Sequence, residues 1–221
     1  MRHVTHLLRA VDRRVGAGVL AAGEARTVEV SQVYDATVDE VWDACTNAER
    51  IPRWFLPVSG DLKEGGHYKL EGNAEGTIER CDPPHGFDAT WEFGGQLSWI
   101  EVRFSAEGDA RTRFALTHIA HVDDGLWAQF GPGAVGIGWD LALIGLALHL
   151  GSGASVDPAE VAAWNASDEG RLFTRRSGEA WRDAHLASGI DPADAAEAAA
   201  ARTIAAYTAS PDGDATPPEE G

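Results

Sequence analysis

Hydrophobic and polar side chains alternate along much of the segment between residues 66 and 120. The alternation occurs in short runs at 66–71, 75–81, 87–94, 97–106 and 111–120, which glycine, asparagine, aspartate and proline residues separate. Such alternation indicates strands with one apolar face, and the short connections predict an antiparallel meander. The residues expected on that face are Tyr68, Leu70, Ala89, Trp91, Phe93, Ile100, Val102, Phe104, Phe114, Leu116 and His118. Because the opposite face is polar, we expect the sheet to be covered on one side only.

Residues 133–150 form a run that is apolar nearly all round, so a helix here needs packing partners on several sides. Its length, about 18 residues, lies at the lower limit for a membrane span. Asp140 inside the run, several glycines in or beside it and the lack of close basic flanks favour a buried core helix instead. We therefore expect this helix to cover the apolar face of the sheet.

The segment before the meander combines one strand with two short helices. Residues 26–34 alternate in the manner of a strand. Thr37 is a candidate helix cap, with Glu40 three residues later as its capping-box partner, and a second short helix is expected from about Asn47. Val38, Val41, Trp42 and Cys45 would make the apolar face of the first helix.

Helix start signals also follow the apolar run. Asp157, Ser167 and Asp191 are caps that precede proline or acidic residues, and they predict helices near 158–165, 168–187 and 192–208. The last of these is rich in alanine, which favours helix by intrinsic propensity. From Ser210 onward the chain is rich in proline, glycine and acidic residues, which predicts disorder.

The N-terminal segment predicts a short amphipathic helix. Leu7, Leu8, Val11 and Val15 fall at helical spacing. The segment lacks the apolar run and small-residue cleavage site of a secretory signal, which favours a cytoplasmic protein.

Composition narrows the possible partners and cofactors. Hydrophobic residues make up 44% of the 221 residues, enough for a substantial core. A formal charge of −17 disfavours binding to nucleic acid or to anionic membranes. Cys45 and Cys81 fall in different predicted elements and form no CxxC pattern, so we expect two reduced thiols and neither a disulfide framework nor a zinc site.

Several short segments, in a fixed order, carry a family resemblance. They are residues 34–44, 51–55, 61–62, 65–66, 76–78, 81–84, 90–91, 112–118 and 138–140. With the order of elements, they resemble the START-like (SRPBCC) superfamily, and within it the chain is similar to bacterial homologues of the heat-shock-protein-90 ATPase activator. The resemblance spans about residues 26–150.

The resemblance implies an α+β helix-grip fold, in which a curved antiparallel sheet wraps around a long helix. The extra helices expected after residue 155 depart from the minimal family pattern. The expected organisation is a helical extension at 1–24, the START-like domain at 25–151, a helical extension at 152–209 and a disordered tail at 210–221. The C-terminal helices would cap the long helix, occlude the pocket or make a homodimer contact, and the sequence leaves these alternatives open.

The helix-grip architecture implies a pocket between sheet and helix, and the chain is rich in aromatic residues that would line it. Aromatic walls suit a flat apolar or aromatic ligand. The alternative is that these side chains only pack the core. The expected pocket residues are Trp54, Phe55, Tyr68, Trp91, Phe93, Val102, Phe104, Leu116, His118, Trp127, Phe130, Trp139 and Leu143, with Trp127 and Phe130 on a loop before the long helix.

Two polar residues invite a sharper interpretation. His118 is expected to point inward, as a hydrogen-bond donor or general acid/base. His121 follows three residues later, but positions i and i+3 of a strand face opposite ways, so no metal site is expected. Asp140 must lie either at an exposed helix edge or beside a partner such as Arg53, because an unpaired buried charge is costly.

No catalytic constellation or cofactor motif accompanies the predicted pocket. The chain lacks a GxSxG elbow and a phosphate-binding loop, and neither cysteine has a basic neighbour in sequence. The favoured hypothesis is a module that binds a small hydrophobic molecule without a cofactor. The alternatives are a chaperone-interacting protein and a cyclase- or aromatase-like enzyme in which His118, Tyr68 or Asp140 moves protons.

Overall fold

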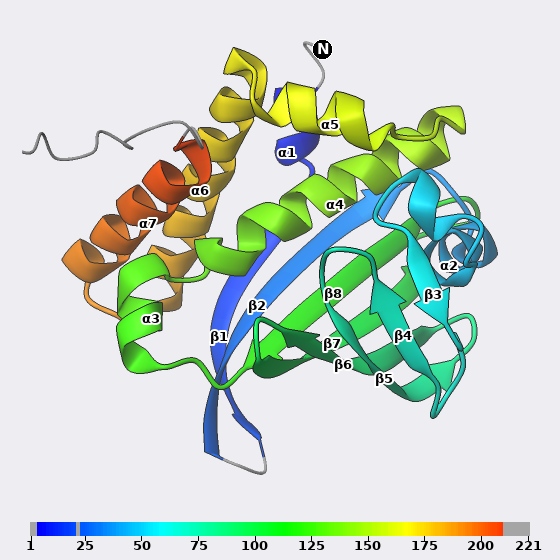
Figure 1. Cartoon of the computed structure of the whole chain (residues 1–221), viewed down its shortest axis with the longest axis horizontal. Helices are drawn as coiled ribbons and strands as arrows, with labels where there is room; N and C mark the ends of the chain where they lie inside the picture. The colour runs from blue at the N-terminus through cyan, green and yellow to red at the C-terminus, as the bar shows by residue number, and fades with distance from the viewer. Residues whose placement is uncertain (1–3, 21–22, 210–221) are drawn as a thin grey trace, which may run out of the picture.

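A computed structural model describes residues 4–20 and 23–209 of the chain. Within this part, one antiparallel sheet has the strand order β1-β2-β8-β7-β6-β5-β4-β3 (Figure 1). The strands are β1 (Asp12–Leu20), β2 (Gly23–Tyr34), β3 (Val58–Gly60), β4 (His67–Leu70), β5 (Glu75–Asp82), β6 (Gly86–Phe93), β7 (Gln96–Ala106) and β8 (Thr112–Ala120). The meander expected from the alternating runs is thus confirmed, and β2 extends it by pairing with the last strand.

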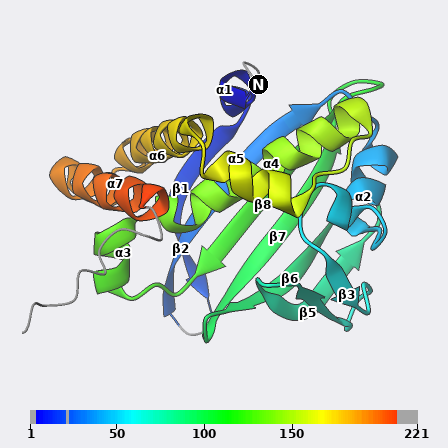
Figure 2. The same ribbon diagram turned by 45° about the horizontal axis from the view of Figure 1, so that its top comes forward.

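Helices cover one face and one end of the curved sheet. They are α1 (Val4–Leu8), α2 (Val38–Thr46), α3 (Asp124–Phe130), α4 (Gly133–Ser152), α5 (Pro158–Asn165), α6 (Asp168–Ser188) and α7 (Ala193–Thr208), with a 3₁₀ turn at Ile51–Arg53. The long helix α4 lies across the concave face, and α5 crosses its outer side (Figures 1 and 2). Helices α6 and α7 pack beside β1 and α3, as the tilted view shows (Figure 2).

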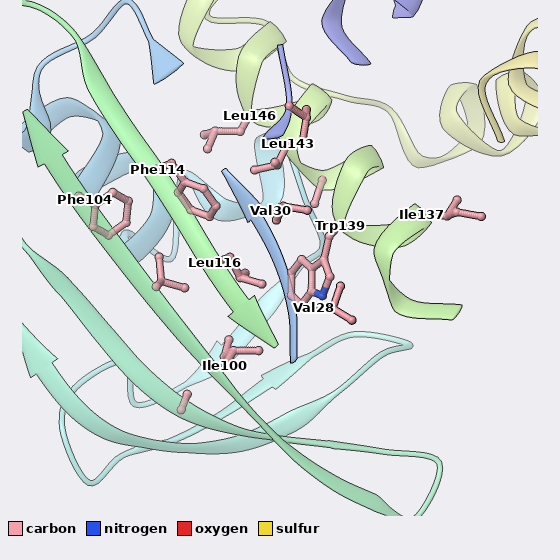
Figure 3. Packing of buried hydrophobic residues seen from close by; sticks show 14 of the residues in the cluster. Val28, Val30, Ile100, Phe104, Phe114, Leu116, Ile137, Trp139, Leu143 and Leu146 are labelled. Carbon is pink, nitrogen blue, oxygen red and sulfur yellow. The ribbon is translucent and has the colours of Figure 1, made fainter. Parts of the chain in front are cut away.

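The core lies between the concave sheet face and α4. Ile100, Phe104, Phe114 and Leu116 of the strands face the helix, and Leu143 of α4 points back toward them (Figure 3). Burial of such side chains contributes roughly 1.5–3 kcal/mol each. The helix-grip fold predicted from the sequence is therefore the fold observed.

Helix α4 is buried on two sides because glycines allow close approach. A methyl group at Gly136 would lie 2.2 Å from the ring of Trp181 in α6, and one at Gly145 would lie 2.2 Å from the carbonyl oxygen of Trp54. The helix is long and apolar enough to cross a membrane, but most of its length is buried inside the fold. It is the core helix of this fold, as the sequence pattern indicated.

The start of α2 departs in one detail from the expected capping box. Thr37 caps the helix, because its hydroxyl accepts the backbone N–H of Glu40 at 3.3 Å. The carboxylate of Glu40 does not return to the cap, since it pairs with the guanidinium of Arg50 at 2.7 Å. The capping box is therefore only half formed.

The N-terminal extension is mainly a strand rather than a helix. Among its described residues, 4–20 and 23–24, only Val4–Leu8 is helical, and Asp12–Leu20 forms β1, which pairs with β2 so that Val15 lies opposite Val28. Helical spacing of four apolar residues was a weak signal, because an edge strand needs only its alternate residues buried. The tail expected to be disordered, 210–221, lies outside the described residues.

Two further local expectations are corrected. Residues 124–130 form helix α3 instead of a loop, since the carboxylate of Asp123 accepts the backbone N–H groups of Gly125 and Leu126 at 2.9 and 3.1 Å. Phe93, expected on the buried face, is 56% exposed. It is the last residue of β6, opposite Gln96 at the hairpin end, where the sheet extends beyond its helical cover.

Candidate functional site

A cavity of about 450 Å³ lies between the sheet and the helical layer. Its floor comes from strands β4 to β8. Its other walls come from α2, the turn after it, β3 with the loop that follows, and the sheet-facing side of α4. The lining residues are Trp42, Cys45, Thr46, Ile51, Trp54, Phe55, Val58, Leu62, Lys63, Glu64, Tyr68, Leu70, Ile78, Cys81, Pro83, Phe87, Ala89, Trp91, Ile100, Val102, Phe114, Leu116, Trp139, Ala142 and Leu143. A second hollow, between α3, α6 and α7, measures only about 10 Å³, too small for a ligand.

Aromatic rings form one continuous wall of the cavity. Trp54 stacks on Phe55 with ring centres 5.5 Å apart, and Phe55 stacks on Trp139 at 6.3 Å, each pair inclined by 24°. Trp91 meets Trp139 at 5.1 Å with a tilt of 57°. Rings from the turn after α2, from α4 and from β6 therefore meet at one place.

Trp54 is held in this wall by the helices on either side of it. Its indole Nε1–H donates to the carbonyl of Ala44 in α2 at 2.9 Å. Its own backbone carbonyl lies against Gly145 of α4, where no larger residue fits. The position of the Trp54 ring is therefore fixed by α2 and α4 together.

The walls of the cavity contain few polar groups, and most of these are bonded within the protein. The hydroxyl of Tyr68 donates to the backbone carbonyl of Thr90 at 2.7 Å, and the hydroxyl of Thr46 donates to the backbone carbonyl of Trp42 at 2.8 Å. Burial, with a smaller contribution from Glu92, raises the pKa of Tyr68 well above its ordinary value. Tyr68 is thus a neutral phenol at physiological pH.

Charged side chains line the cavity only where the loop after β3 meets β5. Lys63 is largely exposed and pairs with Asp61 at 2.7 Å. The carboxylate of Glu64 accepts the backbone N–H of Cys81 at 3.1 Å, which ties the loop to β5. This is the polar edge of an otherwise apolar site.

The two cysteines line the cavity as thiols. Burial raises the pKa of Cys45 well above its ordinary value, and only Arg50 opposes this effect. The pKa of Cys81 is also raised, first by burial and then by Glu64 and Asp82. Because the thiolate is the nucleophile, neither environment activates a cysteine for attack.

His118 is buried behind the aromatic wall and does not line the cavity. Its Nδ1 accepts the indole N–H of Trp139 at 3.2 Å, and its Nε2 lies 2.9 Å from the hydroxyl of Ser98. Burial lowers the pKa of His118 to about 4, so the ring is neutral at physiological pH. A molecule in the cavity meets Trp91 and Trp139 rather than this imidazole.

Eight of the expected pocket residues line the cavity, namely Trp54, Phe55, Tyr68, Trp91, Val102, Leu116, Trp139 and Leu143. Five do not, and Phe93 and His118 have been described above. Phe104 is buried among rings, edge-on to Trp42 and Phe114 with ring centres 5.7 Å away in both pairs. It supports the lining from behind.

Trp127 and Phe130 face the C-terminal helices instead of the cavity. The indole of Trp127 donates to the carboxylate of Asp191 at 2.7 Å, and the carbonyl of Phe130 accepts the hydroxyl of Thr203 at 2.6 Å. The physical reason is that residues 124–130 coil into α3, which packs against α7. A loop would have left these rings free to fold back over the sheet.

Asp140 lies on the side of α4 away from the cavity. Its carboxylate is fully buried and accepts Nε–H of Arg13 at 3.1 and 3.0 Å and the hydroxyl of Ser177. Burial raises the pKa of Asp140, and Arg13 beside it opposes the rise. The partner is therefore Arg13 and not Arg53, and the exposed-edge alternative is wrong.

Sequence reasoning missed the contribution of α2 and of the loop after it. Trp42 and Cys45 were recognised as an apolar helix face, but nothing in the pattern distinguished a face that lines a cavity from one that packs. Leu62, Lys63 and Glu64 sit in a loop with no regular periodicity. Among residues 4–20 and 23–209, none after Leu143 lines the cavity, so the C-terminal helices do not occlude it.

Comparison with known proteins places this geometry in a known group. A family model described as activator of Hsp90 ATPase homolog 1-like protein matches residues 35–151. The crystal structure of CalU16 from Micromonospora echinospora is 38% identical, with a TM-score of 0.65, and the match covers 79% of this chain and 98% of CalU16. Its solution structure is 37% identical over 80% of this chain and 96% of that one, with a TM-score of 0.69.

A more distant structure shares the fold. DynU16, described as a protein in the dynemicin biosynthetic locus, is 21% identical over 58% of this chain and 48% of its own, with a TM-score of 0.53. No curated protein matches the chain.

Proposed function

We propose a function from the premise that the chain belongs to the family of activator of Hsp90 ATPase homolog 1-like proteins. In this proposal the protein binds a small apolar or aromatic molecule in the cavity between the sheet and α4. The single observation that carries this proposal is the cavity of about 450 Å³ with its aromatic wall. Ligand sites in proteins typically measure roughly 300–1,000 Å³ and are lined mainly by apolar and aromatic side chains.

The polar groups of the cavity wall already have hydrogen-bond partners within the protein, which supports an apolar ligand. The indole N–H groups of Trp54 and Trp139 and the hydroxyl of Tyr68 each donate to a group of the protein itself. A ligand that buries apolar surface against these groups breaks no hydrogen bond, whereas a strongly polar ligand would lose its hydration without compensation. Polar substituents would be accommodated beside Lys63 and Glu64.

The positions of the candidate acid–base residues support ligand binding rather than catalysis. The residues considered earlier for proton transfer are poorly placed for it: His118 lies behind the wall, and Asp140 faces away from the cavity. Tyr68 lines the cavity, but its hydroxyl is engaged with Thr90 and its pKa is raised. A general acid or base needs contact with the reacting proton and a pKa near the working pH.

The proposal can be tested with N-phenyl-1-naphthylamine, a neutral aromatic molecule whose fluorescence rises in apolar surroundings. The wild-type protein should bind it saturably. Ala142→Phe or Ala89→Phe should weaken binding at least about tenfold, because each side chain lines the cavity and the new ring would occupy it.

Ala195→Phe on the exposed surface of α7 is the matched control and should bind the probe as the wild type does. Equal binding by all four folded proteins would place the probe elsewhere and contradict the proposal. So would the absence of binding by the wild type to this and other apolar probes.

The chaperone alternative rests on the family description alone. It stays a prediction, and a pull-down with the purified chain as bait would test it against a heat-shock-protein-90 homologue.

A further inference from the structure

A chain of three hydrogen bonds runs behind the aromatic wall. Nε1–H of Trp139 in α4 donates to Nδ1 of His118 in β8 at 3.2 Å. Nε2 of His118 lies 2.9 Å from Oγ of Ser98 in β7, and the Ser98 hydroxyl donates to the carbonyl of Trp91 in β6 at 2.9 Å. The chain of bonds therefore begins at the indole of Trp139 and ends at the backbone of Trp91, two residues of the cavity wall.

The chemistry of these groups permits one arrangement of protons. An indole nitrogen only donates, so Nδ1 of His118 must be the unprotonated acceptor. A neutral imidazole carries its single proton on the other nitrogen, and Nε2–H must then donate to Ser98. The pKa of His118, lowered to about 4 by burial, keeps the ring in this neutral form.

The hydrogen-bond chain fixes the orientation of the Trp139 ring in the wall. The ring of Trp139 also packs against the rings of Phe55 and Trp91, which contact it through faces and edges. Such contacts permit a ring to slide or tilt, whereas a hydrogen bond to Nε1 fixes its edge. A buried indole N–H that lost its acceptor would favour another orientation.

We propose that His118 is a positioning residue of the cavity, which holds Trp139 against Trp91 so that the wall favours flat aromatic ligands over flexible aliphatic ones. The inference rests on the proposed function and adds its selectivity. A flat ring gains stacking energy only against a surface whose tilt is held, whereas an alkyl chain adapts to either shape.

The hydrogen-bond chain can be tested in the ligand-free protein by NMR. Long-range ¹⁵N–¹H correlation should show His118 as the Nε2–H tautomer. In His118→Leu, the indole N–H of Trp139 should exchange with solvent at least about fivefold faster, the factor expected for one lost hydrogen bond. In His118→Asn, whose amide oxygen can take the place of Nδ1, exchange should stay near the wild-type rate. An Nδ1–H tautomer, or equal exchange in all three proteins, would overturn the assignment.

Selectivity is measured with two neutral probes, N-phenyl-1-naphthylamine and 1-dodecanol, the latter by competition. The ratio of their dissociation constants should shift toward dodecanol by at least about fivefold in His118→Leu and return most of the way in His118→Asn. If His118 has a purely structural role, its replacement should weaken the binding of both probes alike. An unchanged ratio of dissociation constants would therefore refute the positioning role. If the wild type binds neither probe, the proposed function itself fails, and the imidazole spectrum still decides whether His118 holds Trp139.

Discussion

Nε of Arg13, in the first strand, lies 3.1 and 3.0 Å from the two carboxylate oxygens of Asp140, in the middle of the long core helix. Both side chains are almost fully buried, and the other guanidinium nitrogens donate to the carbonyls of Val11 and Leu8. The strand that supplies Arg13 precedes the segment matched by the family model. The ion pair therefore joins an element outside the matched segment to the helix that covers the cavity.

Removing one partner of this pair should be strongly destabilising. Arg13→Ala leaves the Asp140 carboxylate buried without its counter-ion, so the free energy of unfolding in urea should fall by about 3–5 kcal/mol. Arg182→Ala is the matched control, because Arg182 forms an exposed pair with Asp183 and should change stability by less than about 1 kcal/mol. Similar losses in the two variants would show that the buried pair contributes no more than a surface pair.

Two glycines of α4, two residues apart, should respond oppositely to alanine. A methyl group at Gly136 overlaps the ring of Trp181, so Gly136→Ala should lower stability by about 1–3 kcal/mol. Nothing lies within 4 Å of a methyl group at the exposed Gly138, where alanine should raise stability by up to about 1 kcal/mol through helix propensity. Thermal unfolding of both variants measures the difference. A Gly136→Ala protein as stable as the wild type would contradict the close packing of α6 on α4.

The buried His118 predicts a specific dependence of stability on pH. Its pKa falls from the ordinary 6.5 to about 4 on folding, so between these values the unfolded chain binds a proton that the folded chain does not. Stability should therefore decrease as the pH falls from about 6.5 to 4, by about 3 kcal/mol from this group, and change no further below that. His118→Asn should show a correspondingly shallower loss over that range. Parallel pH profiles would mean that His118 titrates alike in both states.

The carboxylate of Asp191 should hold the C-terminal helices against α3. It accepts the indole N–H of Trp127 and Nε2–H of His185, each at 2.7 Å. The expectation that Asp191 caps α7 is therefore wrong, because its carboxylate is engaged with these rings and the helix begins after Pro192 without a side-chain cap. Burial alone would raise the pKa of Asp191, but these hydrogen bonds outweigh it and keep the pKa below its ordinary value. Its contribution to stability is thus present at neutral pH and lost in acid, as the carboxyl becomes protonated.

Asp191→Asn should speed amide hydrogen exchange in α7 more than in the central strands, because local opening requires fewer contacts to break. Asp194→Asn, at an exposed position in the first turn of the same helix, should leave that exchange nearly unchanged. Equal effects of the two substitutions would remove the role given to Asp191.

Much of the sheet could be predicted because strand periodicity is a local property. Tyr68, Val102 and Leu116 alternate with polar neighbours, and the chain directions follow from short turns. The apolar run at 133–150 predicted the long helix, and the family resemblance added the position of Trp139 near the pocket. These signals explain why eight of the expected pocket residues line the cavity.

The residues that were misplaced depend on contacts distant in sequence. Trp127 and Phe130 face away because α3 packs on α7, a helix more than sixty residues later. Phe104 packs edge-on against the ring of Trp42, which lines the cavity in its place. The apolar pattern put Trp42 on a helix face but not over any strand. His118 points inward as predicted, yet Trp139 and Trp91 stand in front of it.

The sequence by itself determined the alternating strands, the apolar core helix, the three C-terminal helices and the family, because each depends on spacing along the chain. Only the tertiary structure decided that Arg13 neutralises Asp140, that His118 bonds Trp139 and that a cavity remains between the sheet and α4. The physical reason is that a partner for a buried charge, and the space left between packed side chains, are set by segments that meet only after folding.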